Sequence, residues 1–111
     1  MNTELNLRLA RALWPEREID EPTGCWRMPG STSWRGRRIP DLAGSYEGMG
    51  LALERMLGAG WTVEISTLMG PDGWVVVLRT VGGGICAGSA PRLMQAFERA
   101  VVKALAQWEG T

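Results

Sequence analysis

The most concentrated cationic stretch of the sequence is the run Trp34-Arg-Gly-Arg-Arg38. A guanidinium can hold a phosphate or a carboxylate through two parallel hydrogen bonds, and an adjacent indole can stack on a base or on another guanidinium. The same pair of residue types stands a few residues earlier, at Trp26 and Arg27. We therefore predict a binding site for a small anionic ligand, such as a nucleotide. Its predicted residues are Trp26, Arg27, Trp34, Arg35, Arg37 and Arg38.

An acidic block just before this run allows a different interpretation of the same arginines. The carboxylates in the segment 16–21 are Glu16, Glu18, Asp20 and Glu21. Opposite charges this close in sequence often pair on a solvated surface, so the arginines can be neutralised within the loop. The indoles of Trp14, Trp26 and Trp34 can likewise support the segment by packing instead of binding a ligand. Both interpretations remain open from the sequence.

Several kinds of catalytic chemistry lack their residues in this chain. The sequence contains no histidine, which removes Ser-His-Asp and Cys-His nucleophiles, imidazole zinc sites and the usual general base at neutral pH. Its two cysteines, Cys25 and Cys86, are far apart, and the short strand around Cys86 makes that residue a candidate for the core. The carboxylates form neither a calcium-loop pattern nor an E-x-x-E pair on a helical face. We expect a protein that is not an enzyme and holds no metal or cofactor.

Two further places in the sequence have features of an anion-binding site. The run Gly82-Gly83-Gly84 joins two predicted strands and lacks the following helix of a phosphate loop, so it predicts a tight turn. Ser89 and Pro91 are typical of a helix start, with Arg92 in the first turn. The amino end of the last helix is therefore a better candidate than the glycine run.

The overall charge is balanced, with 12 Lys+Arg against 12 Asp+Glu. This balance argues against a nucleic-acid binder with a uniformly basic surface. A chain of 111 residues, 45% of them hydrophobic, is long enough for one domain. We predict a single domain over 1–111, in which residues 1–45 form an amino-terminal part and 46–109 the core. No apolar run is long enough to span a membrane, and with two thiols and no secretion signal we expect a location in the cytoplasm.

The amino-terminal part is predicted to contain one helix and a long irregular segment. Leu5, Leu9 and Leu13 recur at helical spacing and predict a helix over 3–14 that ends before Pro15. Residues 16–45 are rich in proline and glycine and lack apolar periodicity. Short extended pieces are expected near 24–28 and 34–39.

The core is predicted to be an antiparallel meander flanked by helices. A helix over 46–57 starts at Ser45, strands follow at 61–67, 74–78 and 85–87, and a last helix runs to residue 108. The fold class is therefore α+β, with a three- to four-stranded sheet in an α-β-α sandwich. The strand at 74–78 is apolar on both faces and should be covered on both sides, by the amino-terminal part or by a second copy of the chain.

The run Ile39–Trp61, the Gly73-Trp-Val75 hairpin and the Ala87-Gly-Ser-Ala-Pro91 entry into an alanine-rich helix resemble the phage ABA sandwich domain. The opening run from Leu5 to Pro15 and Gly24-Cys-Trp26 resemble the start of such phage proteins. The resemblance implies an alpha-beta-alpha sandwich from a bacteriophage or prophage and carries no catalytic residues. The element order is also similar to the double-stranded-RNA-binding domain, but the last helix lacks the lysine-rich start of that family.

Together these observations predict a non-enzymatic phage accessory protein. Its expected role is to bind and sequester a small anionic ligand, with a nucleotide signal of host antiviral defence as the candidate, and to act as a homo-oligomer. The alternative is an inhibitor or adaptor that binds a host or phage protein through exposed aromatic side chains. Binding to nucleic acid is the least favoured, because the net charge is zero.

Overall fold

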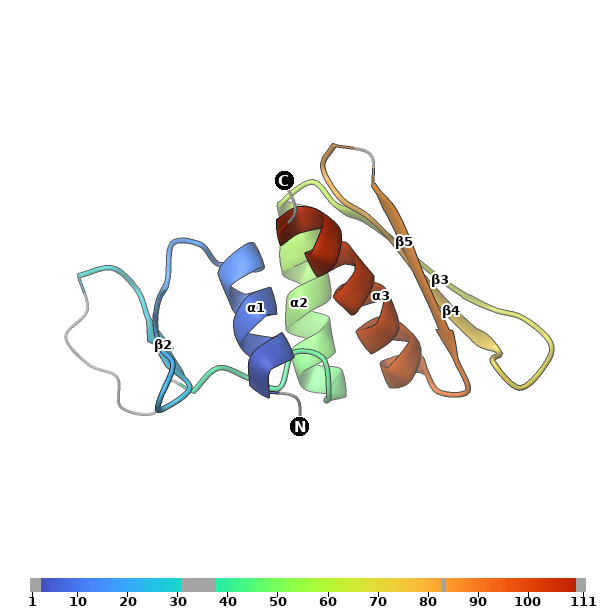
Figure 1. Ribbon diagram of the computed structural model, residues 1–111, viewed down its shortest axis with the longest axis horizontal. Helices are drawn as coiled ribbons and strands as arrows, with labels where there is room; N and C mark the ends of the chain where they lie inside the picture. Colours follow the sequence, from blue (N-terminus) through green and yellow to red (C-terminus); the bar gives the residue numbers. More distant parts are fainter. Residues whose placement is uncertain (1–2, 31–37, 83, 110–111) are drawn as a thin grey trace.

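The computed structural model describes residues 3–30, 38–82 and 84–109 (Figure 1). Along the chain the elements are α1 (Thr3–Leu13), β1 (Glu18–Asp20), β2 (Cys25–Arg27), α2 (Tyr46–Gly58), β3 (Thr62–Thr67), β4 (Trp74–Arg79), β5 (Ile85–Ala90) and α3 (Leu93–Glu109). The helices and the last three strands lie close to where the sequence predicts them. No helix among these residues is both long and apolar enough to cross a membrane.

The sheet is an antiparallel meander in the order β3-β4-β5, with β4 in the centre. One face is buried beneath α3, which lies along the sheet (Figure 1). Val76 and Leu78 of β4 and Cys86 of β5 are fully or almost fully buried there, together with Phe97 and Val101 of α3. The alternation of apolar residues in the strands and the helical spacing in α3 bring these side chains into one core. The predicted α+β fold, an antiparallel meander with helices packed on it, is confirmed.

The junction between β5 and α3 differs from the prediction, which ended the strand at residue 87 and started the helix at Ser89. In the structure β5 continues past Ser89, and α3 begins at Leu93. Gly88 lies directly beneath α3, where a Cβ atom would come within 2.3 Å of the carbonyl oxygen of Ala96. Because glycine allows this close approach, the strand can pass under the helix and keep its pairing with β4. Ser89 is therefore a strand residue, and the anion site expected at that helix start is not formed.

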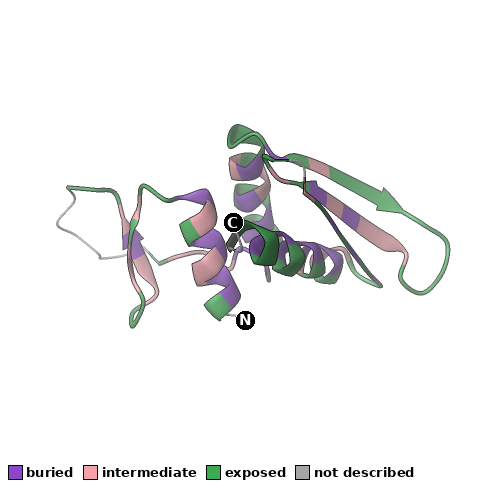
Figure 2. Cartoon of the chain, turned by 45° about the horizontal axis from the view of Figure 1, so that its top comes forward, coloured by how far each residue is buried: buried purple, intermediate pink, exposed green. Residues whose placement is uncertain are grey.

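The three helices that the structure describes lie on one side of the sheet (Figure 1), where α3 packs on β4 and β5, and α1 and α2 both contact α3. The other face carries exposed residues such as Ile85 and Ser89, while Val75 and Val77 are half-buried (Figure 2). The arrangement thus differs in one respect from the expected sandwich with helices on both faces. Within the described ranges the amino-terminal part does not supply the second cover predicted for the strand at 74–78.

The amino-terminal segment forms a small antiparallel hairpin of β1 and β2, on the far side of α1 from the sheet (Figure 1). Arg38 adds an isolated bridge to Cys25, and the amide of Ile39 donates to the carbonyl oxygen of Gly24 at 2.9 Å. The extended piece predicted near 24–28 is confirmed, whereas β1 was not predicted. Of the piece predicted at 34–39, residues 34–37 lie outside the described residues.

Candidate functional site

Two indoles and two guanidinium groups form a continuous cluster where the hairpin meets α1 and α2. The rings of Trp14 and Trp26 meet edge to face, with their centroids 5.1 Å apart. The guanidinium of Arg17 lies over the Trp26 ring at 4.3 Å, and that of Arg55 lies 5.7 Å from the Trp14 ring. Both indoles are buried. Aromatic packing and cation–π contacts therefore attach the hairpin to the helices.

The carboxylates of the acidic block pair with arginines from three different elements. Glu18 accepts a hydrogen bond from Nε of Arg27 at 2.7 Å, across the hairpin. Glu21 pairs with Arg11 of α1, and Glu16 pairs with Arg55 of α2. Among these pairs, Glu18 with Arg27 is local, as the sequence allowed, whereas Arg35 and Arg37 of the run 34–38 lie outside the described residues.

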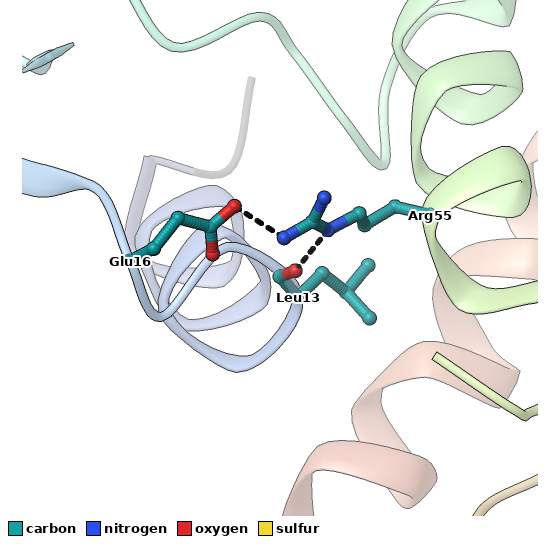
Figure 3. A network of polar contacts seen from close by, with 3 residues as sticks. All are labelled: Leu13, Glu16 and Arg55. Carbon is teal, nitrogen blue, oxygen red and sulfur yellow. Dashed lines mark hydrogen bonds and ion pairs between the residues drawn. The ribbon is translucent and has the colours of Figure 1, made fainter. Parts of the chain in front are cut away.

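Arg55 makes the contact that ties α2 to the end of α1 (Figure 3). Its Nε donates to the backbone carbonyl oxygen of Leu13 at 2.6 Å, and its Nη2 pairs with Glu16. The carbonyl of Leu13 lies in the last turn of α1, where the helix leaves its carbonyl groups without internal partners. Arg55 therefore acts as a side-chain cap for α1 as well as a partner for Trp14.

The structure describes three of the six predicted site residues, and these three have different surroundings. Trp26 is only 7% exposed, and its contacts with Trp14 and Arg17 give it a structural role. Arg27 is paired with Glu18 across the hairpin. Arg38 is exposed and follows the part of the loop that is not described. Three predicted residues, Trp34, Arg35 and Arg37, lie outside the described residues.

Arg38 lines a small pocket between the amino end of α1 and the turn of the hairpin. The pocket has a volume of about 180 Å³. It is lined by Thr3, Asn6, Leu7, Glu21, Pro22, Thr23, Gly24, Arg38 and Ile39. Among the predicted site residues, Arg38 is thus the one that the described chain places at a cavity.

Charged groups of both signs surround this pocket. Glu21 is its acidic lining residue, and the ion pair with Arg11 offsets that charge. Arg38 makes no side-chain hydrogen bond or ion pair with the described residues. The first turn of α1 adds the partial positive charge of a helix amino end. A cationic side chain and a helix dipole therefore face the same small space.

Asn6 holds the floor of the pocket in place. This residue is buried, its amide nitrogen donates to Oδ1 of Asp41 at 2.9 Å, and its Oδ1 accepts from the amide of Ala43 at 3.2 Å. These bonds attach α1 to the loop that leads into α2. The loop then ends at the predicted cap, where Oγ of Ser45 accepts from the amide of Gly48 at 3.0 Å. Both the nitrogen and the oxygen of the Asn6 amide are therefore engaged in bonds that hold α1 against this loop.

A larger open groove of about 620 Å³ lies between the end of α1 and α2. Its lining includes Trp14, Leu51, Glu54, Arg55 and Trp108. The guanidinium of Arg55, the cationic group of this groove, is already bonded to Leu13 and Glu16. Glu54 adds negative charge to the lining. The groove is larger than the pocket at Arg38 but less suited to an anionic ligand.

The two cysteines differ in environment. Cys86 is buried beneath α3, and this burial raises the pKa of its thiol above the ordinary value, while the positive charge of Lys103 partly opposes the shift. A neutral buried thiol is a poor nucleophile, consistent with the predicted core role. Cys25 is half-buried in the hairpin. Among the described residues no three Cys, Asp or Glu side chains are grouped to hold a metal ion.

Three residues of the aromatic and charged clusters were not singled out from the sequence: Arg11, Arg17 and Arg55. Arg11 and Arg55 lie on helices, and their partners are distant in sequence. For these three residues, the sequence shows only that Arg17 lies within the acidic block. Periodicity shows which helix face an arginine occupies, but the residue that meets it depends on how the helices pack.

Comparison with known proteins identifies a related fold. No family model matches the sequence, and no curated protein matches it significantly. The structure is similar to a phage protein from Bacillus cereus ATCC 14579, known from a 2.0 Å crystal structure, with a TM-score of 0.66 and 16% sequence identity. The match covers 94% of this chain and 86% of that one. At this identity the similarity shows a shared fold that extends over nearly the whole chain.

Proposed function

We propose that this chain is a non-enzymatic accessory protein of a phage or prophage that binds and sequesters a small anionic ligand. The observation that carries the proposal is the pocket at Arg38, where a guanidinium and the amino end of α1 face one small cavity. The fold shared with a phage protein supports the phage origin. A nucleotide signal of host antiviral defence is the candidate ligand.

The size of the pocket limits what it can hold. A volume of about 180 Å³ lies below the roughly 300–1,000 Å³ of typical small-molecule sites. The pocket therefore suits a single anionic group, such as one phosphate, and not a whole nucleotide. The proposal assigns the rest of the ligand to Trp34, Arg35 and Arg37, which precede Arg38 in the sequence and supply the stacking and cationic groups that a nucleotide requires.

Isothermal titration against mononucleotides, cyclic dinucleotides and ADP-ribose derivatives tests this proposal. We expect saturable binding of at least one compound and a weakening of about 10- to 100-fold in Arg38→Ala, because a charge-assisted hydrogen bond is lost. Arg79→Ala is the matched control, since Arg79 is exposed at the end of β4 and should leave affinity unchanged. Absence of heat with every compound, from a folded sample, would refute the proposal.

A second function, binding of a protein partner, is favoured by one observation. The tip of the β3–β4 hairpin presents Leu68 at 65% exposure and Met69 fully exposed. Exposed apolar side chains of this size are typical of recognition surfaces. A tagged chain should then capture a stoichiometric protein from infected cells, and Met69→Glu should abolish the capture. Release of a small molecule on denaturation, without a protein partner, would favour the first proposal instead.

A further inference from the structure

The two edges of the sheet are treated differently by the rest of the chain. Along β5, side chains of α3 bond the outward carbonyl groups: Nζ of Lys103 donates to the carbonyl oxygen of Ala87 at 2.7 Å, and Nη1 of Arg99 donates to that of Ser89 at 2.6 Å. An edge strand otherwise offers unpaired groups to any passing strand. The outward carbonyl groups of Ala87 and Ser89 are therefore already bonded within the chain itself.

The opposite edge, along β3, retains its unpaired groups. The amide of Leu68 donates to the carbonyl oxygen of Gly73 at 2.7 Å, so the even-numbered positions of β3 bond toward β4. Backbone groups alternate in direction along an antiparallel strand. Those of Val63, Ile65 and Thr67 therefore point to the outer edge, where the described residues supply no hydrogen-bond partner. By the same alternation, the backbone groups of Ala87 and Ser89 point to the outer edge of β5, in agreement with the hydrogen bonds that their carbonyl oxygens accept from α3.

The side chains of β3 give its edge little of the usual protection. The strand Thr62–Thr67 has one charged residue, Glu64, and no lysine, proline or bulge, and its register with β4 is unbroken. Ile65 points to the face covered by α3 but is still 41% exposed. Natural edge strands are normally blocked by such devices. An unblocked edge with a half-uncovered isoleucine at its centre is suited to pairing with another strand.

We propose that two copies of this chain pair through their β3 strands, antiparallel about a twofold axis at Ile65, to form one six-stranded sheet. This interface goes beyond the proposed ligand binding and is independent of it. The amide and carbonyl of Ile65 in each copy form a pair of hydrogen bonds with those of the other, because both groups point outward. The two isoleucine side chains meet on the face that carries α3 and cover each other.

The order of residues in β3 favours pairing with a second copy of the same strand, in the register centred on Ile65. Opposed residues in an antiparallel pair lie on the same face, so the strand can meet its own copy only at certain positions. A twofold at Glu64 would place two carboxylates opposite each other, which is unfavourable. The twofold at Ile65 instead places Glu64 opposite Ser66, whose hydroxyl can donate to it, and Val63 opposite Thr67. The strand is thus complementary to a second copy of itself.

Sedimentation equilibrium of wild type and two lysine variants tests the dimer. We expect the wild type to have twice the 12.1 kDa mass of one chain. Ile65→Lys should raise the dimer dissociation constant about 100-fold, since two ammonium groups replace an apolar contact at the axis. Ile85→Lys is the matched control, because Ile85 is also an exposed isoleucine of an edge strand, and it should remain dimeric. A monomeric wild type, or a dimer that persists in Ile65→Lys, would overturn the proposal.

Disulfide cross-linking distinguishes the proposed register, with its twofold axis at Ile65, from the neighbouring register with the axis at Glu64. Opposed non-hydrogen-bonded residues have Cα atoms about 4.5 Å apart, within the range of a disulfide. In a Cys25→Ser background, a mixture of the Glu64→Cys and Ser66→Cys chains should form a disulfide-linked dimer on mild oxidation. Glu64→Cys alone should cross-link much less. Efficient cross-linking of Glu64→Cys by itself would contradict the axis at Ile65.

Discussion

Two regions of the molecule bury large aromatic side chains but are held by different forces. One is α3 with the sheet beneath it, and the other is the amino-terminal hairpin. Beneath α3, Phe97 is fully buried among aliphatic residues such as Val76 and Leu78. In the hairpin, Trp26 is covered by one other indole and by the guanidinium of Arg17. The first region depends on apolar burial, whereas the second combines aromatic contacts with ion pairs at partly exposed sites.

This difference indicates how stability is distributed. Burying an apolar side chain is worth about 1.5–3 kcal/mol and is insensitive to salt, whereas a partly exposed ion pair contributes about 0–1 kcal/mol and is screened. The α3–sheet unit should therefore carry most of the free energy of unfolding. The hairpin, which holds Trp26 and Arg27 of the predicted ligand residues and one wall of the Arg38 pocket, should open at lower cost. Such a division is typical of a binding segment on a stable scaffold.

The largest effect is expected for Phe97→Ala, which removes a fully buried ring between α3 and the sheet. We expect a loss of about 3–5 kcal/mol in the free energy of unfolding, measured by urea denaturation. The whole chain should be destabilised, including the hairpin. A loss below about 1 kcal/mol would show that this core is not the main source of stability.

Trp26→Ala should cause a smaller loss of about 2–4 kcal/mol, confined to the hairpin. Hydrogen exchange should become fast at β1 and β2, while the amides of β4 retain their protection. Trp108→Ala is a useful control, because Trp108 is 45% exposed and lies away from the hairpin, with its ring 6.4 Å from that of Trp61. Loss of protection throughout the sheet in Trp26→Ala would contradict the division into two regions.

Asn6→Ala should cost about 1–3 kcal/mol, because the amide of Ala43 and the carboxylate of Asp41 lose a buried partner. The variant tests whether α1 is coupled to α2 by polar bonds. Thermal unfolding followed by circular dichroism measures the change. Thr3→Ala, on the same helix but at an exposed position, should have little effect; equal stability of Asn6→Ala and wild type would show that these bonds contribute nothing.

The charged contact at the end of α1 should contribute least of the side-chain pairs. Glu16→Gln removes only the partly exposed ion pair with Arg55 and should cost less than about 1 kcal/mol. Arg55→Met also deprives the carbonyl of Leu13 of its donor and should cost more. The Glu16→Gln effect should vanish in 1 M salt. If it persisted, the pair would not be a screened surface interaction.

The thiol proton of Cys86, in the core beneath α3, should make the stability of the protein depend on pH in the alkaline range. Because the pKa of the Cys86 thiol is raised by burial, the folded state keeps this proton after the unfolded thiol, with a pKa of about 8.5, has lost it. The stabilising contribution is complete below that pKa and falls as pH rises toward the folded pKa. Wild type should thus lose stability relative to Cys86→Ala above about pH 8.5. A constant difference across this range would contradict it.

The helices and the meander could be predicted from sequence because each is encoded by local patterns. Leu5, Leu9 and Leu13 recur at helical spacing, Ser45 is a typical cap, and the strand at 62–67 alternates apolar and polar residues. The end of β5 was missed for a non-local reason: Gly88 continues the strand beneath α3, although the residues that follow it look like a helix start.

The candidate site was predictable only in part. The excess of tryptophan and arginine in the first third of the chain correctly indicated stacking of indoles on guanidinium groups, as at Trp26 and Arg17. The sequence predicted Trp26 and Arg27 as ligand residues, a prediction that stays untested; in the structure the first is buried and the second is paired with Glu18. The pocket at Arg38 depends on where α1 lies against the hairpin, which no local pattern encodes.

By itself, the sequence determined the element types, the α+β class and the absence of histidine chemistry, because these follow from residue identity and short-range spacing. Only the tertiary structure decided which carboxylate meets which arginine and that the helices gather on one side of the sheet. It also decided that, within the described residues, α3 bonds outward carbonyl groups of β5 while the outward groups of β3 have no partner. These features depend on contacts between segments far apart in the chain. Their free energies arise only once packing brings the partners together.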